Sequence, residues 1–347
     1  MRIELFDITK GILMILVILG HGMQYLYGDD YSAGGAFFNE PLYKCIYSFH
    51  MPLFMMISGY FYFVSLSKGF RYVLKSRVSS ILIPYATYFV IYLFLSYVLK
   101  IVYWGGWFSA IVNVFWFLPS LFLNCIIVMI CRGIIKKSNI SNVVLLCVCI
   151  LLLFVKSYLP ATYIFMLYCF ITGYYIRFIT IKHEININKL KNTSSLVFSI
   201  MILLFCFASF NYETFIYTSG TCIFKEGYID YNMVIIDIKR YLIGILGSLS
   251  FMYLIWYKRK TLNRIVVRYL VRISEYSIGM YCISNIYYLI YSHFISFKFD
   301  NDLQFVGYQH YLYVFILSFA IIIISFLTIM LINKSKKLNI LFLGLRR

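Results

Sequence analysis

Residues 7–21 read DITKGILMILVILGH, and this stretch decides the fold class. Between Lys10 and His21 no side chain is charged, and the apolar run continues to about residue 27. A helix that crosses roughly 30 Å of hydrocarbon needs about 20 predominantly apolar residues, so the sequence predicts a membrane span over residues 8–27. No Ala-x-Ala cleavage site follows this run, and we therefore expect the span to remain in the mature protein.

The rest of the chain repeats this pattern. Of its 347 residues, 62% are hydrophobic and only 13% are charged, and the mean hydropathy is +0.84, which excludes an ordinary soluble globule. We expect an all-α fold, a polytopic integral membrane bundle of about ten transmembrane helices forming one membrane-embedded domain over residues 1–347. The nine further predicted spans are 42–66, 78–100, 111–131, 142–158, 160–179, 194–212, 236–257, 269–294 and 309–333.

The charges predict how these spans face. The net charge is +18, and the basic residues gather in alternate connections such as 68–77 and 258–272, whereas acidic residues favour the connections between them. Because Lys and Arg accumulate in short cytoplasmic loops, both termini are predicted to be cytoplasmic. The same distribution points to the lipid bilayer as partner and argues against nucleic acid. The nine cysteines are odd in number and lie mostly in apolar stretches, so they form no disulfide framework.

Two ionisable residues lie within the first span. Lys10 and His21 are eleven residues apart, which places them on nearly the same helix face and roughly 16 Å apart along the axis. Ionisable groups inside a membrane are costly and mark candidate functional sites. The simpler interpretation of Lys10 is a snorkelling side chain paired with Asp7.

A second histidine is predicted at a similar depth. His50 begins the sequence HMPLF, about eight residues from the outer end of the second span, and His21 lies roughly 10 Å from the same surface. Two histidines at one depth favour proton-transfer chemistry over a structural role for each. A zinc site would need further ligands, and no third His, Cys or carboxylate lies at matching depth in these two spans, so no metal is expected.

Other polar and small residues have simpler explanations. Gly20, Ser58 and Gly59 are expected to let helices approach closely. Asp237 and Arg240 are three residues apart and predict an internal ion pair, with contact to a substrate as the alternative.

Several of these stretches resemble one known family. Asp7 to His21, SFHMPLF (48–54) with SGY (58–60), Arg77 followed by Pro84-Tyr85, and WFLP (116–119) are similar to landmarks of the acyltransferase family 3 membrane proteins. The resemblance implies a bacterial inner-membrane enzyme that transfers an acyl group, most often acetyl, from cytoplasmic acyl-CoA to a hydroxyl of an extracytoplasmic sugar. Family members modify surface polysaccharide, lipopolysaccharide, exopolysaccharide or glycolipid. The specific part of the resemblance lies within about the first 120 residues.

The resemblance and the chemistry together suggest roles. His21 is predicted to be the general base, with acyl transfer through His21 itself left open, and His50 either orients the acceptor or polarises the thioester. The candidates for the acyl-CoA phosphates are Lys10, Arg71, Lys75 and Arg77. The candidates for substrate contact are Asp7, Ser58, Tyr60, Tyr85, Trp116 and Arg240.

Two departures and two alternatives accompany this interpretation. Lys10 stands where the family usually has Arg, which keeps the charge but loses the bidentate fork, and Asn285 stands where many members have His.

A transporter or flippase for polysaccharide precursors would also need ten spans and polar groups in the membrane. Transporters tend to carry paired halves with interrupted helices, and no such duplication is visible in this sequence. A structural or regulatory membrane protein is the weaker alternative, in which His21 would be dispensable.

Overall fold

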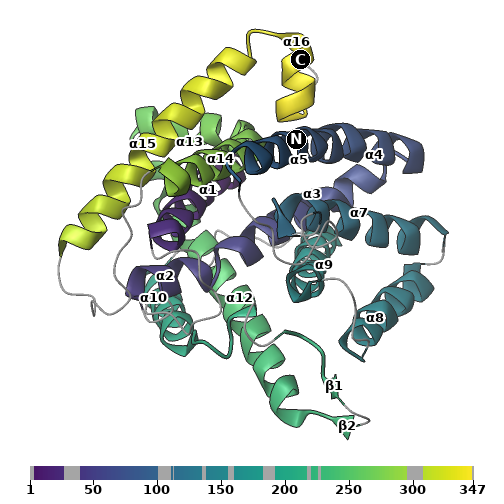
Figure 1. The fold of residues 1–347 in the computed structure, drawn as a ribbon. Helices are drawn as coiled ribbons and strands as arrows, with labels where there is room; N and C mark the ends of the chain where they lie inside the picture. The colour runs from purple at the N-terminus through teal and green to yellow at the C-terminus, as the bar shows by residue number, and fades with distance from the viewer. Residues whose placement is uncertain are drawn as a thin grey trace. The chain divides into compact units, whose positions relative to one another are not determined.

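The computed structural model describes residues 4–26, 40–100, 111, 113–134, 138–154, 160–182, 192–216, 220–225, 228–294 and 308–345 (Figure 1). These residues are overwhelmingly helical, and a helix occupies every segment predicted to span the membrane. The helices in the first half are α1 (Glu4–Leu26), α2 (Pro41–Tyr47), α3 (His50–Leu66), α4 (Phe70–Arg77), the π-helical turn η2 (Val78–Leu82), α5 (Ile83–Val98), α7 (Phe117–Ile134) and α8 (Ser138–Phe154). Those in the second half are α9 (Ala161–Lys182), α10 (Thr193–Ser209), α12 (Tyr231–Lys258), the 3-10 turn η4 (Arg259–Thr261), α13 (Arg264–Glu275), α14 (Ser277–Phe294), α15 (Tyr308–Ile332), α16 (Lys336–Leu338) and η5 (Asn339–Leu343). The short strands β1 (Phe224–Lys225) and β2 (Tyr228–Ile229) pair antiparallel.

Five of the described helical stretches are long and apolar enough to cross a membrane, which makes the chain a multi-pass membrane protein. They are Glu4–Tyr25, Pro41–Leu66, Phe70–Val98, Ala161–Ile181 and Tyr311–Ile332. Three shorter apolar helices are Phe117–Arg132, Ile140–Leu152 and Thr193–Ser209. The count of ten spans and the cytoplasmic termini remain predictions.

One predicted span begins too early. The segment 269–294 is divided at Tyr276, where the backbone leaves helical geometry between α13 and α14. The reason is the polarity of α13, which carries three arginines in twelve residues and is strongly amphipathic rather than uniformly apolar. The apolar part of this predicted span is therefore α14, from Ser277 onward.

The described residues form two compact units. The first comprises residues 1–50, 83–103 and 251–347, and the second comprises 51–82 and 104–250. In the first unit, α1 lies against α13, α14 and α15. In the second unit, α7 packs against α8, α9 and η2.

Glycines allow the closest helix contacts within each unit, as the sequence predicts for Gly20 and Gly59. A methyl group on Gly59 of α3 would meet the backbone carbonyl of Phe170, and one on Gly173 of α9 would meet that of Met56. In the first unit, Gly20 lies against the ring of Tyr47, 2.8 Å from where its Cβ would be. Backbones can approach this closely only where the side chain is absent.

Candidate functional site

His21 lies in the first unit, on the face of α1 that meets α14. Its ring centroid is 6.2 Å from that of Tyr281 and 6.5 Å from that of Tyr288, which meets it edge-on. The Nδ1 atom of His21 is buried and has no hydrogen-bond partner among the residues that the structure describes. A buried polar atom without a partner is costly, so this ring suits a site that a substrate completes.

His50 begins α3 and belongs to the same unit. Its side chain is 3% exposed, and its Nδ1 lies 2.7 Å from the carbonyl oxygen of Ile46. A carbonyl oxygen can only accept, so Nδ1 carries the proton and donates it. In the neutral ring, Nε2 therefore holds the lone pair and can accept a hydrogen bond but cannot donate one.

The helix that precedes α3 links α1, which carries His21, to His50. Both imidazoles belong to the first unit. Tyr47 ends α2, and the centre of its ring is 4.8 Å from that of His50. Gly20 of α1 lies against the ring of Tyr47. Tyr47 also donates a 3.4 Å hydrogen bond to Gln24 of α1. The pairing of the two histidines at one depth and their catalytic roles remain predictions.

A tyrosine of α14 fixes the turn of α1 that carries His21. Tyr288 is fully buried and donates a 2.8 Å hydrogen bond to the carbonyl oxygen of Ile18, three residues before His21. Its hydroxyl is also 3.1 Å from Ser318 Oγ of α15, and its ring stacks on Tyr25 at 5.3 Å. The sequence analysis assigned a site role to neither Tyr281 nor Tyr288, and nothing in a chain with 34 tyrosines separates Tyr288 from the others.

The other end of α1 carries Lys10 and Asp7. Lys10 Nζ is 3.2 Å from Asp7 Oδ1, as the simpler sequence interpretation predicts. Ser274 of α13 donates a 3.3 Å hydrogen bond to the same oxygen, and the backbone of Leu270 lies against Gly11. Lys10 remains 27% exposed, so its ammonium group is accessible to an anion while Asp7 is held by two partners.

In the second unit, two arginines lie against tyrosine rings. Arg77 donates a 3.1 Å hydrogen bond to Ser65 Oγ, and its guanidinium is 5.2 Å from the ring centre of Tyr62. Arg177, on α9, donates a 2.8 Å hydrogen bond to the hydroxyl of Tyr60. The Nε atoms of both arginines are buried without a hydrogen-bond partner among the described residues. Arg177 was not predicted as a site residue, and its position near the end of an apolar segment was the signal available in the sequence.

The remaining candidates are described within the unit to which each belongs. In the second unit, Arg71 and Lys75 are exposed on α4, and Ser58 donates a 2.9 Å hydrogen bond to the carbonyl of Phe54 within α3. Trp116 lies in the turn before α7, with its ring 6.0 Å from that of Phe117. Tyr85 belongs to the first unit, where it is buried and stacks on Phe89 at 5.8 Å.

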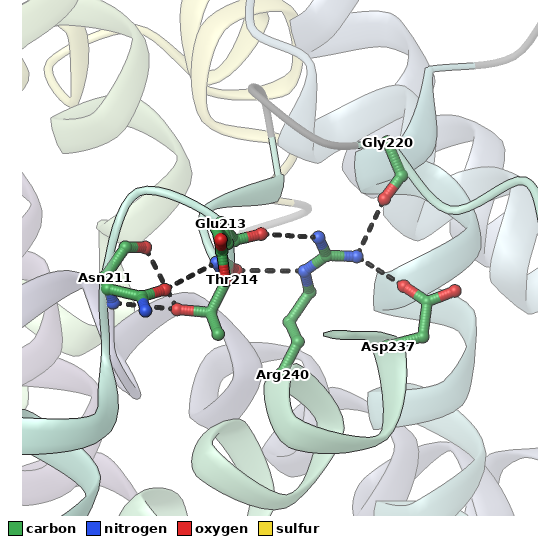
Figure 2. A network of polar contacts seen from close by, with 6 residues as sticks. All are labelled: Asn211, Glu213, Thr214, Gly220, Asp237 and Arg240. Atoms are coloured by element: carbon green, nitrogen blue, oxygen red, sulfur yellow. Dashed lines mark hydrogen bonds and ion pairs between the residues drawn. The ribbon is translucent and has the colours of Figure 1, made fainter. Parts of the chain in front are cut away.

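Arg240 is the centre of a polar network in the second unit (Figure 2). Its guanidinium donates to the carbonyl oxygens of Thr214 at 2.9 Å, Gly220 at 2.8 Å and Glu213 at 3.4 Å, and to the carboxylate of Asp237 at 2.5 Å. The side chain is 4% exposed. The predicted internal ion pair is therefore present, and it joins α12 to the segment that follows α10. Substrate contact by Arg240 stays a prediction.

The described residues hold no group of three or more His, Cys, Asp or Glu side chains arranged to bind a metal ion.

Comparison with known proteins places the chain in a family. The family model described as an acyltransferase domain, that of acyltransferase family 3, matches residues 3–332. The chain belongs to this family.

Two curated relatives match a short part of the chain. The nodulation protein NolL of Mesorhizobium japonicum is 48% identical over 80 residues, which is 23% of this chain and 21% of the relative. The nodulation protein NolL of Sinorhizobium fredii is 54% identical over 55 residues, which is 16% of this chain and 14% of the relative. The matched stretches thus span less than a quarter of either relative. No solved structure matches the chain significantly.

Proposed function

We propose that the protein is an O-acyltransferase of the bacterial inner membrane, with acetyl-CoA or another acyl-CoA as donor. The acceptor is a hydroxyl of an extracytoplasmic sugar, in a surface polysaccharide, lipopolysaccharide, exopolysaccharide or glycolipid. The observation that carries this proposal is the pair of imidazoles in the first unit, one with a buried nitrogen that lacks a partner among the described residues and one with a fixed tautomer. Transfer between a thioester and a hydroxyl needs a group that accepts and returns one proton, which neutral imidazole provides near neutral pH.

In the proposed reaction His21 takes the proton of the acceptor hydroxyl. The hydroxyl oxygen attacks the thioester carbonyl carbon, the new C–O bond forms, and the C–S bond breaks. CoA leaves as a thiolate and receives the proton from the His21 imidazolium. The proton and the acyl group are therefore both accounted for without another reactant.

The tautomer of His50 distinguishes between its two predicted roles. Nε2 of the neutral ring can accept a hydrogen bond from a second hydroxyl of the same sugar. It cannot donate one to the thioester carbonyl, because the only ring proton is already given to Ile46. The geometry therefore favours His50 as the residue that orients the acceptor.

The candidates for the donor phosphates are those that the sequence suggests, Lys10 in the first unit and Arg71, Lys75 and Arg77 in the second. Within its own unit, Lys10 has an accessible ammonium group, and Arg77 has a buried Nε without a partner among the described residues. Guanidinium and ammonium groups are the usual partners of phosphate oxygens.

Three variants test the proposal in a deletion strain. We expect His21→Ala to abolish acylation, and His50→Asn, whose amide can still donate to Ile46, to raise the acceptor KM more than it lowers kcat. His293→Ala is the matched control, because His293 is exposed at the end of α14 and its recorded ring contact is with Phe294.

The readout is mass spectrometry of surface glycans and glycolipids at equal protein abundance, together with CoA release by the purified protein. An acyl increment that disappears with His21→Ala and survives His293→Ala supports the proposal. Unchanged glycan masses combined with accumulation of a lipid-linked precursor in the deletion strain would instead establish a transporter. Full activity of His21→Ala would remove the imidazole from the mechanism.

A further inference from the structure

A basic pocket lies in the first unit between η4 and α13. It has a volume of about 810 Å³ and is lined by five basic side chains, Arg259, Lys260, Arg264, Arg268 and Arg272. Glu4 of α1 and Glu275 at the end of α13 also line it, which leaves an excess of three positive charges. None of these residues belongs to the candidate acyl-transfer site.

The sequence of α13 explains how the arginines come together. Arg264, Arg268 and Arg272 recur every four residues, so they project from one face of the helix. A different face is fixed in the protein, since Leu270 is buried and its backbone lies against Gly11 of α1. The arginine face is therefore held in place by the packing of α13 on α1.

The charges in this pocket are not neutralised from within. Arg264, Arg268 and Arg272 are exposed, and none of them forms an ion pair with a carboxylate in the part of the chain that the structure describes. An arrangement of several basic side chains around a cavity, with fewer acidic ones, suits a phosphate-bearing anion.

Exposed apolar side chains beside the arginines indicate where this anion comes from. Ile265 is 60% exposed, Val266 48% and Tyr269 58%, all on α13. A helix with a basic face and an exposed apolar face lies in the membrane interface, with the apolar side chains in the lipid and the bases at the headgroups. Basic pockets beside transmembrane helices bind anionic phospholipid headgroups in the same way.

We propose that the η4–α13 pocket binds the headgroup of an anionic phospholipid, with the lipid chains lying along Ile265, Val266 and Tyr269. The phosphate of the headgroup contacts Arg268 and Arg272. A soluble polyanion such as CoA shares the phosphate chemistry but gains nothing from the apolar side chains. The proposed site is independent of acyl transfer, and either can be wrong without the other.

The test uses the full-length protein in a neutral detergent, titrated with dihexanoyl phosphatidylglycerol and with dihexanoyl phosphatidylcholine by calorimetry. The double variant Arg268→Gln/Arg272→Gln removes two charges from the pocket. The matched control, Lys336→Gln/Lys337→Gln, removes two charges from exposed positions of α16. Each Lys or Arg near an anionic surface contributes about 1 kcal/mol to binding. We therefore expect the loss of two arginines to weaken the binding of phosphatidylglycerol about thirty-fold in the pocket variant. The control variant is expected to bind as the wild type does.

Competition separates the sources of phosphate. We expect inorganic phosphate and CoA to leave the phosphatidylglycerol affinity unchanged at concentrations equal to the lipid. The proposal is overturned if the pocket variant binds phosphatidylglycerol as tightly as the control, or if phosphatidylcholine binds equally well to the wild type. Displacement of the lipid by CoA would assign the pocket to a soluble anion and also overturn the lipid assignment.

Discussion

The crossing of α3 and α9 gives the sharpest test of the packing. Gly59 of α3 faces the carbonyl of Phe170 on α9, and Gly173 of α9 faces the carbonyl of Met56 on α3. On each helix, the glycine lies three residues after the carbonyl that the opposite glycine faces. A methyl group at either glycine would overlap a backbone carbonyl of the opposite helix. A carbonyl in a helix cannot rotate away as a side chain does, so the helices must move apart by about 1 Å or more to restore ordinary contact.

The expected magnitude follows from two opposing effects. Replacing glycine by alanine inside a helix favours the helix by about 1 kcal/mol. Overpacking costs about 1–3 kcal/mol where side chains can adjust, and more where backbone must move. We therefore expect Gly59→Ala and Gly173→Ala each to lower the free energy of unfolding by about 2–3 kcal/mol. The double variant should cost less than the sum, because one separation of the helices relieves both overlaps.

The assay is thermal unfolding of the purified protein in detergent, with Gly244→Ala as the control. Gly244 is also a buried helical glycine of the second unit, but its Cβ would meet side-chain atoms of Phe165 and Pro52 at 3.2 Å. These atoms can shift by a few tenths of an ångström, so this variant should change stability by less than about 1 kcal/mol. Equal melting temperatures for Gly59→Ala and Gly244→Ala would refute the close crossing.

Three further variants test other contacts. Tyr288→Phe removes the hydroxyl that donates to Ile18, in the turn of α1 that carries His21. Kinetics should show a lower kcat, and thermal unfolding a loss of about 1–2 kcal/mol in stability. Both losses should be larger than for Tyr291→Phe on the same helix. Lys10→Ala should raise the KM for acyl-CoA with little change in melting temperature, because Lys10 is partly exposed and its ion pair contributes little; an unchanged KM would remove it from the donor site. Arg240→Gln should destabilise the protein by about 3 kcal/mol or more, since Asp237 would lose its buried partner. Limited proteolysis should then cut near the carbonyls that Arg240 holds, at residues 213–214 and 220. Lys239→Gln, at an exposed neighbouring position, should behave as the wild type.

The sequence is sufficient to predict the helical fold, because apolar length and local charge are properties of each segment alone. A helix lies in every segment that the apolar pattern marks as a span. One boundary differs: the predicted span 269–294 includes the end of the amphipathic helix α13, because averaging over a window hides its arginine repeat and merges it with the apolar α14. The break at Tyr276 depends on tertiary contacts as well, since its hydroxyl accepts a 3.1 Å hydrogen bond from Asn333, in the turn that follows α15.

The candidate site was only partly predictable for a different reason. Spacing along α1 relates Lys10 to Asp7, and the internal pair follows directly. Tyr288 reaches His21 from a helix about 270 residues later in the chain, and no local pattern records such a contact. The tautomer of His50 likewise depends on the carbonyl oxygen of Ile46, which lies where α2 ends and also accepts a 3.4 Å hydrogen bond from the Phe49 N–H.

The discontinuity of the first unit has a consequence for biosynthesis. Helix α1 is made before its packing partners α13, α14 and α15, which begin only at Arg264. At about 5–20 residues per second, the ribosome needs on the order of ten to fifty seconds to produce the intervening chain. During this interval α1 enters the bilayer with Asp7 and His21 lacking the neighbours on α13 and α14 that they have in the finished protein. Until then, lipid and the insertion machinery must accommodate the polar side chains of α1. Substitutions in α1 can therefore change how much protein is inserted even where they do not change the stability of the finished fold.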